Sequence, residues 1–307
     1  MILGASGLTG YKAMQQARQR FQNVFGTYNS RVSPDKSLIK LDLSKEEELS
    51  KLIVDTKPDA ILNATALHNV DYCELHPEEA FYINSKVVGK LASICNNIGA
   101  RLVHISTDYV FDGNNKLYSE TDAANPLSVY AKSKLEGESQ ARRCNSFAIL
   151  RPSVVYGWTP LETQGSNSSS GKPMNFALWA LSKLAKGEEL KIVNDQFTSP
   201  TLADVLAAVS LRLASRDNND LYHVSGTSCI SRYEFTVQLA QTMGYPTELV
   251  KPIESKSFVQ AAKRPVFSCL KCDKIQEELK MTLPDTAQSL AIMRSQIEVE
   301  SPSLLGN

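Results

Sequence analysis

The first half of the chain alternates short apolar runs with longer segments in which apolar residues recur every three or four positions. Short apolar runs are typical of buried strands, and the longer spacing is typical of amphipathic helices. We therefore expect strands at 1–3, 23–28, 37–42, 59–66 and 101–107, and helices at 9–21, 45–56 and 77–99. Strands that alternate with helices predict a doubly wound α/β fold, in which a parallel sheet carries helices on both faces.

The alternation of strand and helix patterns becomes less regular after about residue 150. Helical patterns recur at 174–186, 201–215, 231–243 and 273–280. The Ser/Gly-rich stretch at 163–173 is typical of a surface loop. We expect a first domain over 1–155, with a returning contribution near 188–215, and a smaller second domain over 156–307. The stretch from about residue 295 is polar, and we expect it to be frayed.

Charge and hydropathy exclude several classes of protein. Lys plus Arg and Asp plus Glu both total 33, so the formal net charge is zero and neither a nucleic acid nor an anionic membrane is expected as a partner. No apolar run approaches the roughly 18 residues needed to span a bilayer, and the N-terminus lacks the pattern of a secretory signal. We expect a cytoplasmic protein.

The cysteines and histidines do not predict a metal site. The six cysteines are scattered, and they are Cys73, Cys95, Cys144, Cys229, Cys269 and Cys272. This scatter is typical of reduced thiols in a cytoplasmic protein. The close pair at 269 and 272 lacks nearby histidines or a second pair, which favours ordinary packing over a zinc or redox site. His68 and His104 also lack partners at ligand spacing, so no metal is expected.

A glycine-rich loop, GASGLTG, follows the first predicted strand and opens the first predicted helix. Glycine lets backbone N–H groups approach a pyrophosphate, and the start of a helix adds partial positive charge. In this context a dinucleotide site is favoured over a plain tight turn. The residues expected to line the cofactor are Gly4, Ser6, Gly7, Leu8, Thr9 and Gly10. Only three residues precede the first glycine, whereas a strand usually has about five, so we expect the native chain to begin upstream.

The end of the second predicted strand favours NADP(H) over NAD(H). An acid at this point would bind the ribose 2′-hydroxyl of NAD. The chain has Asn29, Ser30 and Arg31 instead, which offer an amide, a hydroxyl and a guanidinium to a 2′-phosphate. A solvated loop charge is the alternative role for Arg31. Asp42 and Leu43 end the third strand, where the adenine is expected.

The segment YAKSK predicts an acid–base pair. Tyr130 and Lys134 share one face of a helix, where the ammonium is expected to lower the tyrosine pKa and let it protonate a carbonyl oxygen during hydride transfer. STDYVFDG ends a predicted strand, where ligands of α/β sheets bind. There Thr107 can bind the same carbonyl and Asp108 can accept from a substrate hydroxyl. Tyr109 and Phe111 either contact the substrate or close the strand end.

With these motifs the chain resembles the extended short-chain dehydrogenase/reductases, and within them the dTDP-4-dehydrorhamnose reductase family. The resemblance covers nearly the whole chain, and it rests on GASGLTG, NATALHNVD, STDYVFDG, PLSVYAKSKLEGE, LRPSVVYG, VNDQFTSPT, YHVSGTSCISRYEF and KRP. It implies NADPH-dependent reduction of the 4-keto group of a nucleotide-linked 6-deoxysugar, in a Rossmann domain with a smaller substrate domain. It further implies roles for the following residues: Thr107, Tyr130 and Lys134 in catalysis, Lys134 at the nicotinamide ribose, Thr65, Ala66 and Leu67 along the cofactor, and Thr107 and Asp108 at the sugar.

One departure from the family pattern and one shared set of motifs keep other functions open. The family usually has a sugar-packing tryptophan where this chain has Val154, although Asn175 lies where the second domain is expected to face the sugar. The same motifs occur in the regulatory beta subunit of methionine adenosyltransferase, which binds a partner enzyme. A sugar-nucleotide epimerase is a third alternative, whereas the TDY sequence argues against the related dehydratases. A homodimer is also compatible with the family.

Overall fold

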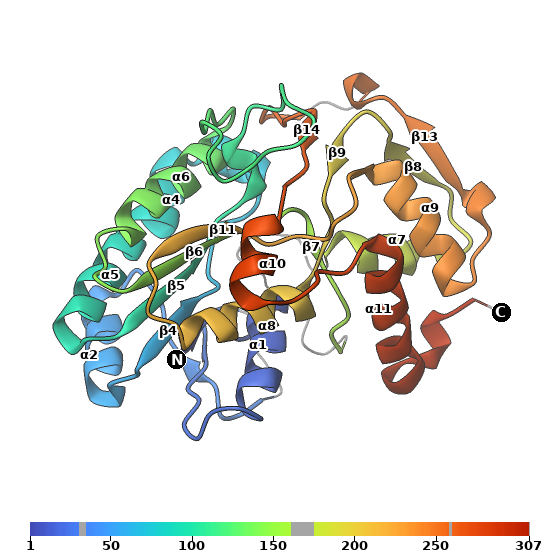
Figure 1. The fold of residues 1–307 in the computed structure, drawn as a ribbon. Helices are drawn as coiled ribbons and strands as arrows, with labels where there is room; N and C mark the ends of the chain where they lie inside the picture. The colour runs from blue at the N-terminus through green and yellow to red at the C-terminus, as the bar shows by residue number, and fades with distance from the viewer. Residues whose placement is uncertain (31–34, 161–174, 258–259, 307) are drawn as a thin grey trace.

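A five-stranded parallel sheet lies at the centre of the first half of the computed structural model, which describes residues 1–30, 35–160, 175–257 and 260–306 (Figure 1). Its strands, in spatial order, are β1 (Ile2–Leu3), β4 (Ala60–Asn63), β5 (Arg101–Ile105), β6 (Phe147–Arg151) and β11 (Asp220–His223). They are largely buried because helices cover both faces of the sheet. The predicted doubly wound α/β fold is confirmed.

The order of the strands reverses beside β1. Strands β2 (Thr27–Tyr28) and β3 (Ile39–Lys40) pair in parallel on its other side, and the backbone N–H of Ile2 donates to the carbonyl oxygen of Phe25 at 2.7 Å. β1 therefore lies between β2 and β4. In α/β sheets the ligand binds outside the carboxyl ends of the strands at such a reversal. The glycine loop begins directly after β1, at this point.

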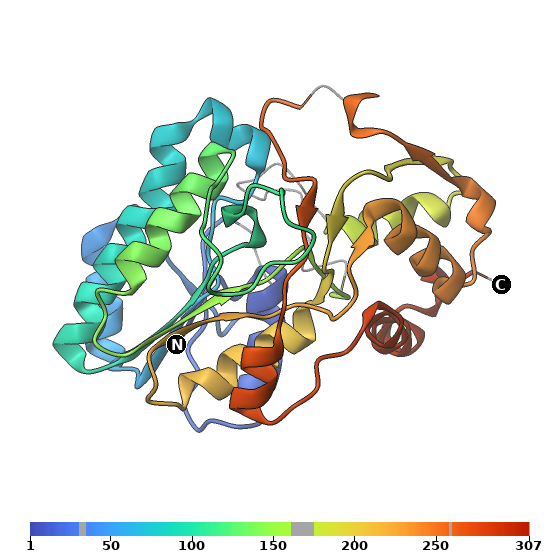
Figure 2. The ribbon, with the colours of Figure 1, turned by 45° about the horizontal axis from the view of Figure 1, so that its top comes forward.

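Two layers of helices cover the sheet. One face carries α1 (Leu8–Ala17), α8 (Ala203–Ala214) and α10 (Asp273–Leu279), and the other carries α2 (Glu46–Thr56), α5 (Val87–Ile98) and α6 (Val129–Ala141). Figure 2 shows both layers, with α6 and α5 side by side. The helix expected at 77–99 is divided into α4 (Pro77–Phe81), a π-helical turn (Tyr82–Lys86) and α5, and α3 (Val70–Leu75) precedes it.

A second lobe surrounds its own apolar core, at the right of Figure 1 beside the C-terminus. Its helices are α7 (Phe176–Leu184), α9 (Arg232–Met243) and α11 (Thr286–Glu300). Its strands are β8 (Leu190–Val193) paired with β13 (Val250–Ile253), and β9 (Phe197–Thr198) between β12 (Ile230–Ser231) and β14 (Phe267–Ser268). β7 (Val155–Tyr156) pairs with β10 (Thr201–Leu202), and the chain then returns to the first sheet through α8 and β11. The domain boundary at 155 stays a prediction.

The expectation of a frayed end from about residue 295 is wrong, because α11 continues to Glu300. A capping box of Asp285 and Gln288 starts this helix, and the side chains of Met293 and Ile297, four positions apart, are fully buried. The burial of an apolar stripe therefore keeps a polar-looking segment helical. The loop expected at 163–173 lies outside the described residues.

A buried ion pair fixes α6 to the sheet. Glu138 accepts hydrogen bonds from Arg151 Nε at 2.7 Å and Nη2 at 2.8 Å, and from the Ser106 hydroxyl at 2.6 Å. The Glu138 side chain is 0% exposed and that of Arg151 is 5% exposed. Such a pair couples the helix to β5 and β6 at the strand ends, where the site lies.

Replacing Glu138 by Gln should lower the free energy of unfolding by about 3–5 kcal/mol, because the Arg151 guanidinium then stays buried without a counter-charge. Urea denaturation followed by circular dichroism measures the change. Glu48→Gln is the matched control, because it breaks an exposed 3.0 Å pair with Lys45 and should change stability little. Equal losses in the two variants would contradict the role given to the buried pair.

Candidate functional site

The glycine loop leaves the start of α1 open. Gly4 has φ +78, which favours glycine, and a Cβ on Gly10 would lie 2.2 Å from the Gly4 carbonyl oxygen. Gly7 caps the helix without a side chain, and the first turn has no acidic residue. The N–H groups of Leu8 and Thr9 therefore meet no built-in anion, which fits a pyrophosphate. Ser6 lies in the same loop and is largely buried.

Asn84 links the loop at 65–67 to the helix of Tyr130 and Lys134, a role that the sequence motifs did not reveal. Its side chain accepts from the Leu67 N–H at 2.9 Å and donates to the Leu67 carbonyl oxygen and the Ser133 hydroxyl, both at 3.0 Å. Ser133 in turn donates to the Tyr130 carbonyl oxygen at 2.8 Å. Asn84 lies in the π-helical turn. The one sequence signal for its role is that it is a polar residue within an apolar helical pattern.

Thr65, one of the residues expected to line the cofactor, makes structural contacts between two loops. Thr65 donates to the Asn63 side-chain oxygen at 2.5 Å, and a Cβ on Gly4 would meet its methyl group at 2.9 Å, so the two loops touch. Ala66, between Thr65 and Leu67, is half-buried. The loop at 65–67 therefore lies against the glycine loop at the switch point of the sheet.

The other expected cofactor residues lie at the ends of β2 and β3. Asn29 and Ser30 are exposed directly after β2, and Arg31 lies outside the described residues. Asp42 accepts from the Ser44 N–H at 2.9 Å and from the Ser44 hydroxyl at 2.8 Å. Leu43 is 8% exposed and packs in the core under α2 and α5. These residues stay predicted contacts of the adenosine end.

The acid–base pair occupies the first turns of α6, which Ser128 caps. Burial raises the pKa of Tyr130, and the neighbouring Thr107 hydroxyl opposes the rise. Burial lowers the pKa of Lys134 to about 8, against the opposing charge of Glu138. The Lys134 ammonium itself donates to the Ile105 carbonyl oxygen at 2.6 Å. The expected lowering of the tyrosine pKa is wrong for this structure, because burial has the larger effect on the phenol. The phenol is therefore held protonated.

Asp108 is a buried acid of the candidate site. The Thr107 hydroxyl donates to its Oδ1 at 3.1 Å and the Ser153 hydroxyl to its Oδ2 at 2.7 Å. Burial raises its pKa, opposed by the hydroxyls of Ser268, Ser153 and Thr107 and by the charge of Arg232. Asp108 thus joins the end of β5 to the β6–β7 turn, a link that its sequence position did not reveal.

Val154 has a left-handed backbone, with φ 37, directly after Ser153. This conformation is unfavourable for a β-branched residue and is tolerated where surrounding contacts impose it. Here the Thr201 N–H donates to the Val154 carbonyl oxygen at 3.2 Å. Asn175 is less available to a ligand than expected, because it caps α7 and donates to the Gly157 carbonyl oxygen at 3.0 Å.

The two aromatic residues after β5 have different surroundings. Phe111 is fully buried and stacks on Tyr118 with ring centroids 4.1 Å apart, so it closes the strand end. Tyr109 is half-buried and lies edge-on to Tyr130, with centroids 6.2 Å apart. Of the two, only Tyr109 faces the acid–base pair.

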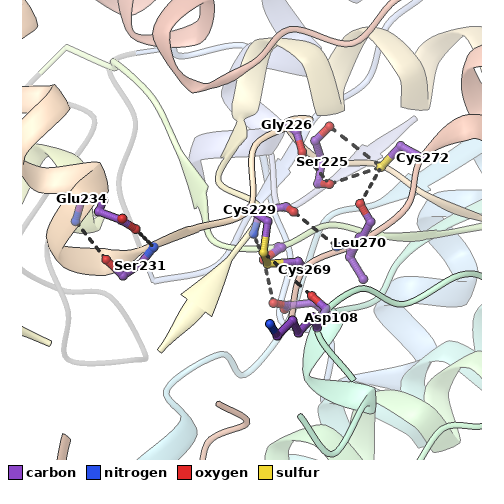
Figure 3. Close-up of a disulfide and its surroundings, with 12 residues drawn as sticks. Asp108, Ser225, Gly226, Cys229, Ser231, Glu234, Cys269, Leu270 and Cys272 are labelled. Atoms are coloured by element: carbon purple, nitrogen blue, oxygen red, sulfur yellow. Dashed lines mark hydrogen bonds between the residues drawn. A yellow bond between two sulfur atoms is a disulfide. The ribbon is translucent and has the colours of Figure 1, made fainter. Parts of the chain in front are cut away.

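The expectation that all six cysteines are reduced is wrong, because Cys229 and Cys269 form a disulfide (Figure 3). The bond joins the segment before β12 to the segment after β14, the two strands that flank β9. Cys269 directly follows Ser268, whose hydroxyl acts on Asp108, and Figure 3 shows Asp108 beside the bond. A separation of 40 residues hid this pairing from the sequence pattern.

The sheet order, the glycine loop and the Tyr130/Lys134 pair define an extended short-chain dehydrogenase/reductase. Residues 1–298 match the model of the family described as RmlD substrate binding domain. The chain belongs to this family. In the described residues, no helix is long and apolar enough to cross a membrane, and no group of three potential metal ligands lies together.

Named relatives cover most of the chain. It is 31% identical over 297 residues to the probable low-salt glycan biosynthesis reductase Agl14 of Haloferax volcanii, which covers 96% of each chain. It is 35% identical over 256 residues to the dTDP-4-dehydrorhamnose reductase of Escherichia coli K12, covering 80% of this chain and 81% of that protein. It is 30% identical over 283 residues to methionine adenosyltransferase 2 subunit beta of Xenopus tropicalis, covering 90% and 81%.

A solved structure agrees over nearly the same length. The dTDP-4-dehydrorhamnose reductase of Bacillus anthracis, in complex with NADP, superposes with a TM-score of 0.84 at 25% identity, covering 96% of this chain and 98% of that one.

Cys229→Ser should lower the free energy of unfolding by about 2–4 kcal/mol, because the disulfide constrains a long loop in the unfolded chain. Thermal unfolding with and without dithiothreitol measures the effect, since Cys229 is exposed. The reductant should destabilise the unmodified protein and leave the variant unchanged. If dithiothreitol destabilised the unmodified protein and the variant equally, the destabilisation would not come from the Cys229–Cys269 disulfide.

Proposed function

We propose that the chain reduces the 4-keto group of a nucleotide-linked 6-deoxysugar with NADPH. The observation that carries this proposal is the placement of Tyr130 and Lys134 on one turn of α6, with the Thr107 hydroxyl against the phenol. The family membership and the reductases among the relatives support the same reaction. NADPH, when bound, supplies the hydride that the carbonyl carbon receives.

The residues of the chain handle the proton and the carbonyl. Tyr130 donates its phenolic proton to the carbonyl oxygen, and its raised pKa keeps that proton in place at neutral pH. Thr107 orients the carbonyl by a hydrogen bond. Lys134, with a pKa of about 8, places a positive charge beside the phenolate that forms and binds the nicotinamide ribose. Asp108 and Val154 line the sugar, and Asn175 borders it.

The cofactor pocket takes NADP(H), in preference to NAD(H). The glycine loop, the loop at 65–67 and the ends of β2 and β3 hold the dinucleotide. Support comes from the sequence after β2, which has no acid for the 2′-hydroxyl, and from the NADP complex of the Bacillus anthracis relative. Arg31 supplies the positive charge for the 2′-phosphate.

A regulatory role is the second candidate. It is favoured by Val154 in place of the expected tryptophan and by the similarity to methionine adenosyltransferase 2 subunit beta. Under this proposal the chain binds NADP(H) and a partner enzyme without turnover. A homodimer also stays a proposal. A cytoplasmic location stays one too, and its support from reduced cysteines is weakened by the Cys229–Cys269 disulfide.

Tyr130→Phe should lower kcat by about 10² or more while NADPH still binds, because the variant keeps the ring and loses the acid. The assay follows NADPH consumption with a dTDP-4-keto-6-deoxyhexose and identifies the product. Tyr72→Phe is the matched control, since the Tyr72 hydroxyl bonds the exposed Glu79 outside the site. Near-normal turnover of Tyr130→Phe would overturn the mechanism, and no turnover by the unmodified protein would favour the regulatory role.

Arg31→Ala should narrow the preference for NADPH over NADH by about 1.5–3 kcal/mol, the contribution of a charge-assisted contact to the 2′-phosphate. Isothermal titration calorimetry with both cofactors measures it. Arg20→Ala is the control, because Arg20 is an exposed cation at the end of α1. Equal affinity of the unmodified protein for the two cofactors would refute the preference.

A further inference from the structure

Arg232 projects from the first turn of α9 toward the acid–base pair. Ser231 and Glu234 form a capping box, with hydrogen bonds of 2.7 and 3.1 Å that Figure 3 shows. The Arg232 N–H also donates to the Gln196 carbonyl oxygen at 3.3 Å. The backbone that carries this guanidinium is therefore fixed, because both ends of the first turn are hydrogen-bonded.

The guanidinium of Arg232 lies on aromatic side chains and meets no acid directly. Its central carbon is 5.3 Å from the centroid of the Phe176 ring, and its Nη2 is 3.5 Å from the Tyr109 hydroxyl oxygen. The second distance is too long for a strong hydrogen bond. In the ranges that the structure describes, Arg232 has no ion pair. A half-buried guanidinium with five N–H donors is thus left with one weak partner.

Arg232 lies close to the proposed proton donor. Tyr109 contacts both groups, because its ring lies edge-on to Tyr130 and its hydroxyl faces the guanidinium. The charge of Arg232 also acts on the buried Asp108. The cation and the Tyr130 phenol come from different lobes and lie about one aromatic side chain apart.

We propose that Arg232 is a specificity-determining residue that binds the diphosphate of the nucleotide-linked sugar. In a 4-keto hexose the carbonyl and the phosphate-bearing carbon lie on opposite sides of the ring. When the carbonyl faces Tyr130, the diphosphate points away from it across the ring, and Arg232 lies across the Tyr109 side chain from Tyr130. A guanidinium binds phosphate oxygens through paired N–H donors. This inference rests on the proposed substrate class, and it adds which residue selects the charged portion of the substrate.

A merely structural role predicts a different result. A cation that only stabilised Asp108 or the Phe176 contact would affect folding or kcat, whereas a diphosphate contact binds ground and transition states alike and sets KM. Arg232→Met keeps an apolar stem over Phe176 and removes the charge. Arg232→Lys keeps the positive charge but loses the paired N–H donors of the guanidinium. It should therefore bind the diphosphate more tightly than Arg232→Met and less tightly than the unmodified protein.

The test is calorimetry with dTDP and thymidine on the full chain, together with kinetics on the 4-keto sugar. Arg232→Met should weaken dTDP binding by about 10–100-fold and leave thymidine and NADPH binding unchanged. KM should rise by a similar factor while kcat changes little. Arg294→Met is the matched control, since Arg294 pairs with Glu298 on the surface of α11 and should leave dTDP binding unchanged.

The outcomes separate this inference from the proposed reaction. Unchanged dTDP affinity in Arg232→Met, or a loss of kcat at constant KM, overturns the inference even if the unmodified protein is a reductase. Failure of the unmodified protein to bind dTDP more tightly than thymidine also overturns it. Loss of dTDP binding in Arg232→Met without turnover by the unmodified protein supports the inference and rejects the reductase. A circular dichroism spectrum equal to that of the unmodified protein shows that the variant is folded.

Discussion

One buried carboxylate holds together the three segments that carry the site. Glu138 lies one helical turn beyond Lys134 on α6, and it binds Ser106 on the segment of Thr107 and Arg151 on the segment of Ser153. A buried charge of this kind is tolerated only when it is paired and hydrogen-bonded, so its partners cannot move independently. The relative position of the acid–base pair and the strand ends follows from this constraint.

Burial then sets the protonation of the groups that this framework brings together. It raises the pKa of Tyr130 and of Asp108, and it lowers that of Lys134 to about 8. All three shifts favour the neutral form. A protonated tyrosine is what reduction of a carbonyl requires, since the acid must give up its proton as the oxygen gains charge.

The second lobe completes the site from the opposite side. Its strands β9, β12 and β14 place Ser268 against Asp108 and begin the helix that carries Arg232. The Cys229–Cys269 bond joins the two flanking segments of this small sheet. The lobe therefore presents its residues to the site as a connected unit.

The sequence by itself determined the alternating fold, the glycine loop at the switch point and the Tyr130/Lys134 turn, because periodicity and spacing are local properties of the chain. It also predicted that Thr107 and Asp108 end a strand, where ligands of parallel sheets bind. Only the tertiary structure decided that Asn84 links the loop at 65–67 to α6 and that Cys229 pairs with Cys269. The same holds for Arg232, which meets Tyr109 over a separation of 123 residues. Such contacts depend on how elements that are distant in the sequence pack together. The pKa shifts also depend on this packing, because it is packing that buries the groups.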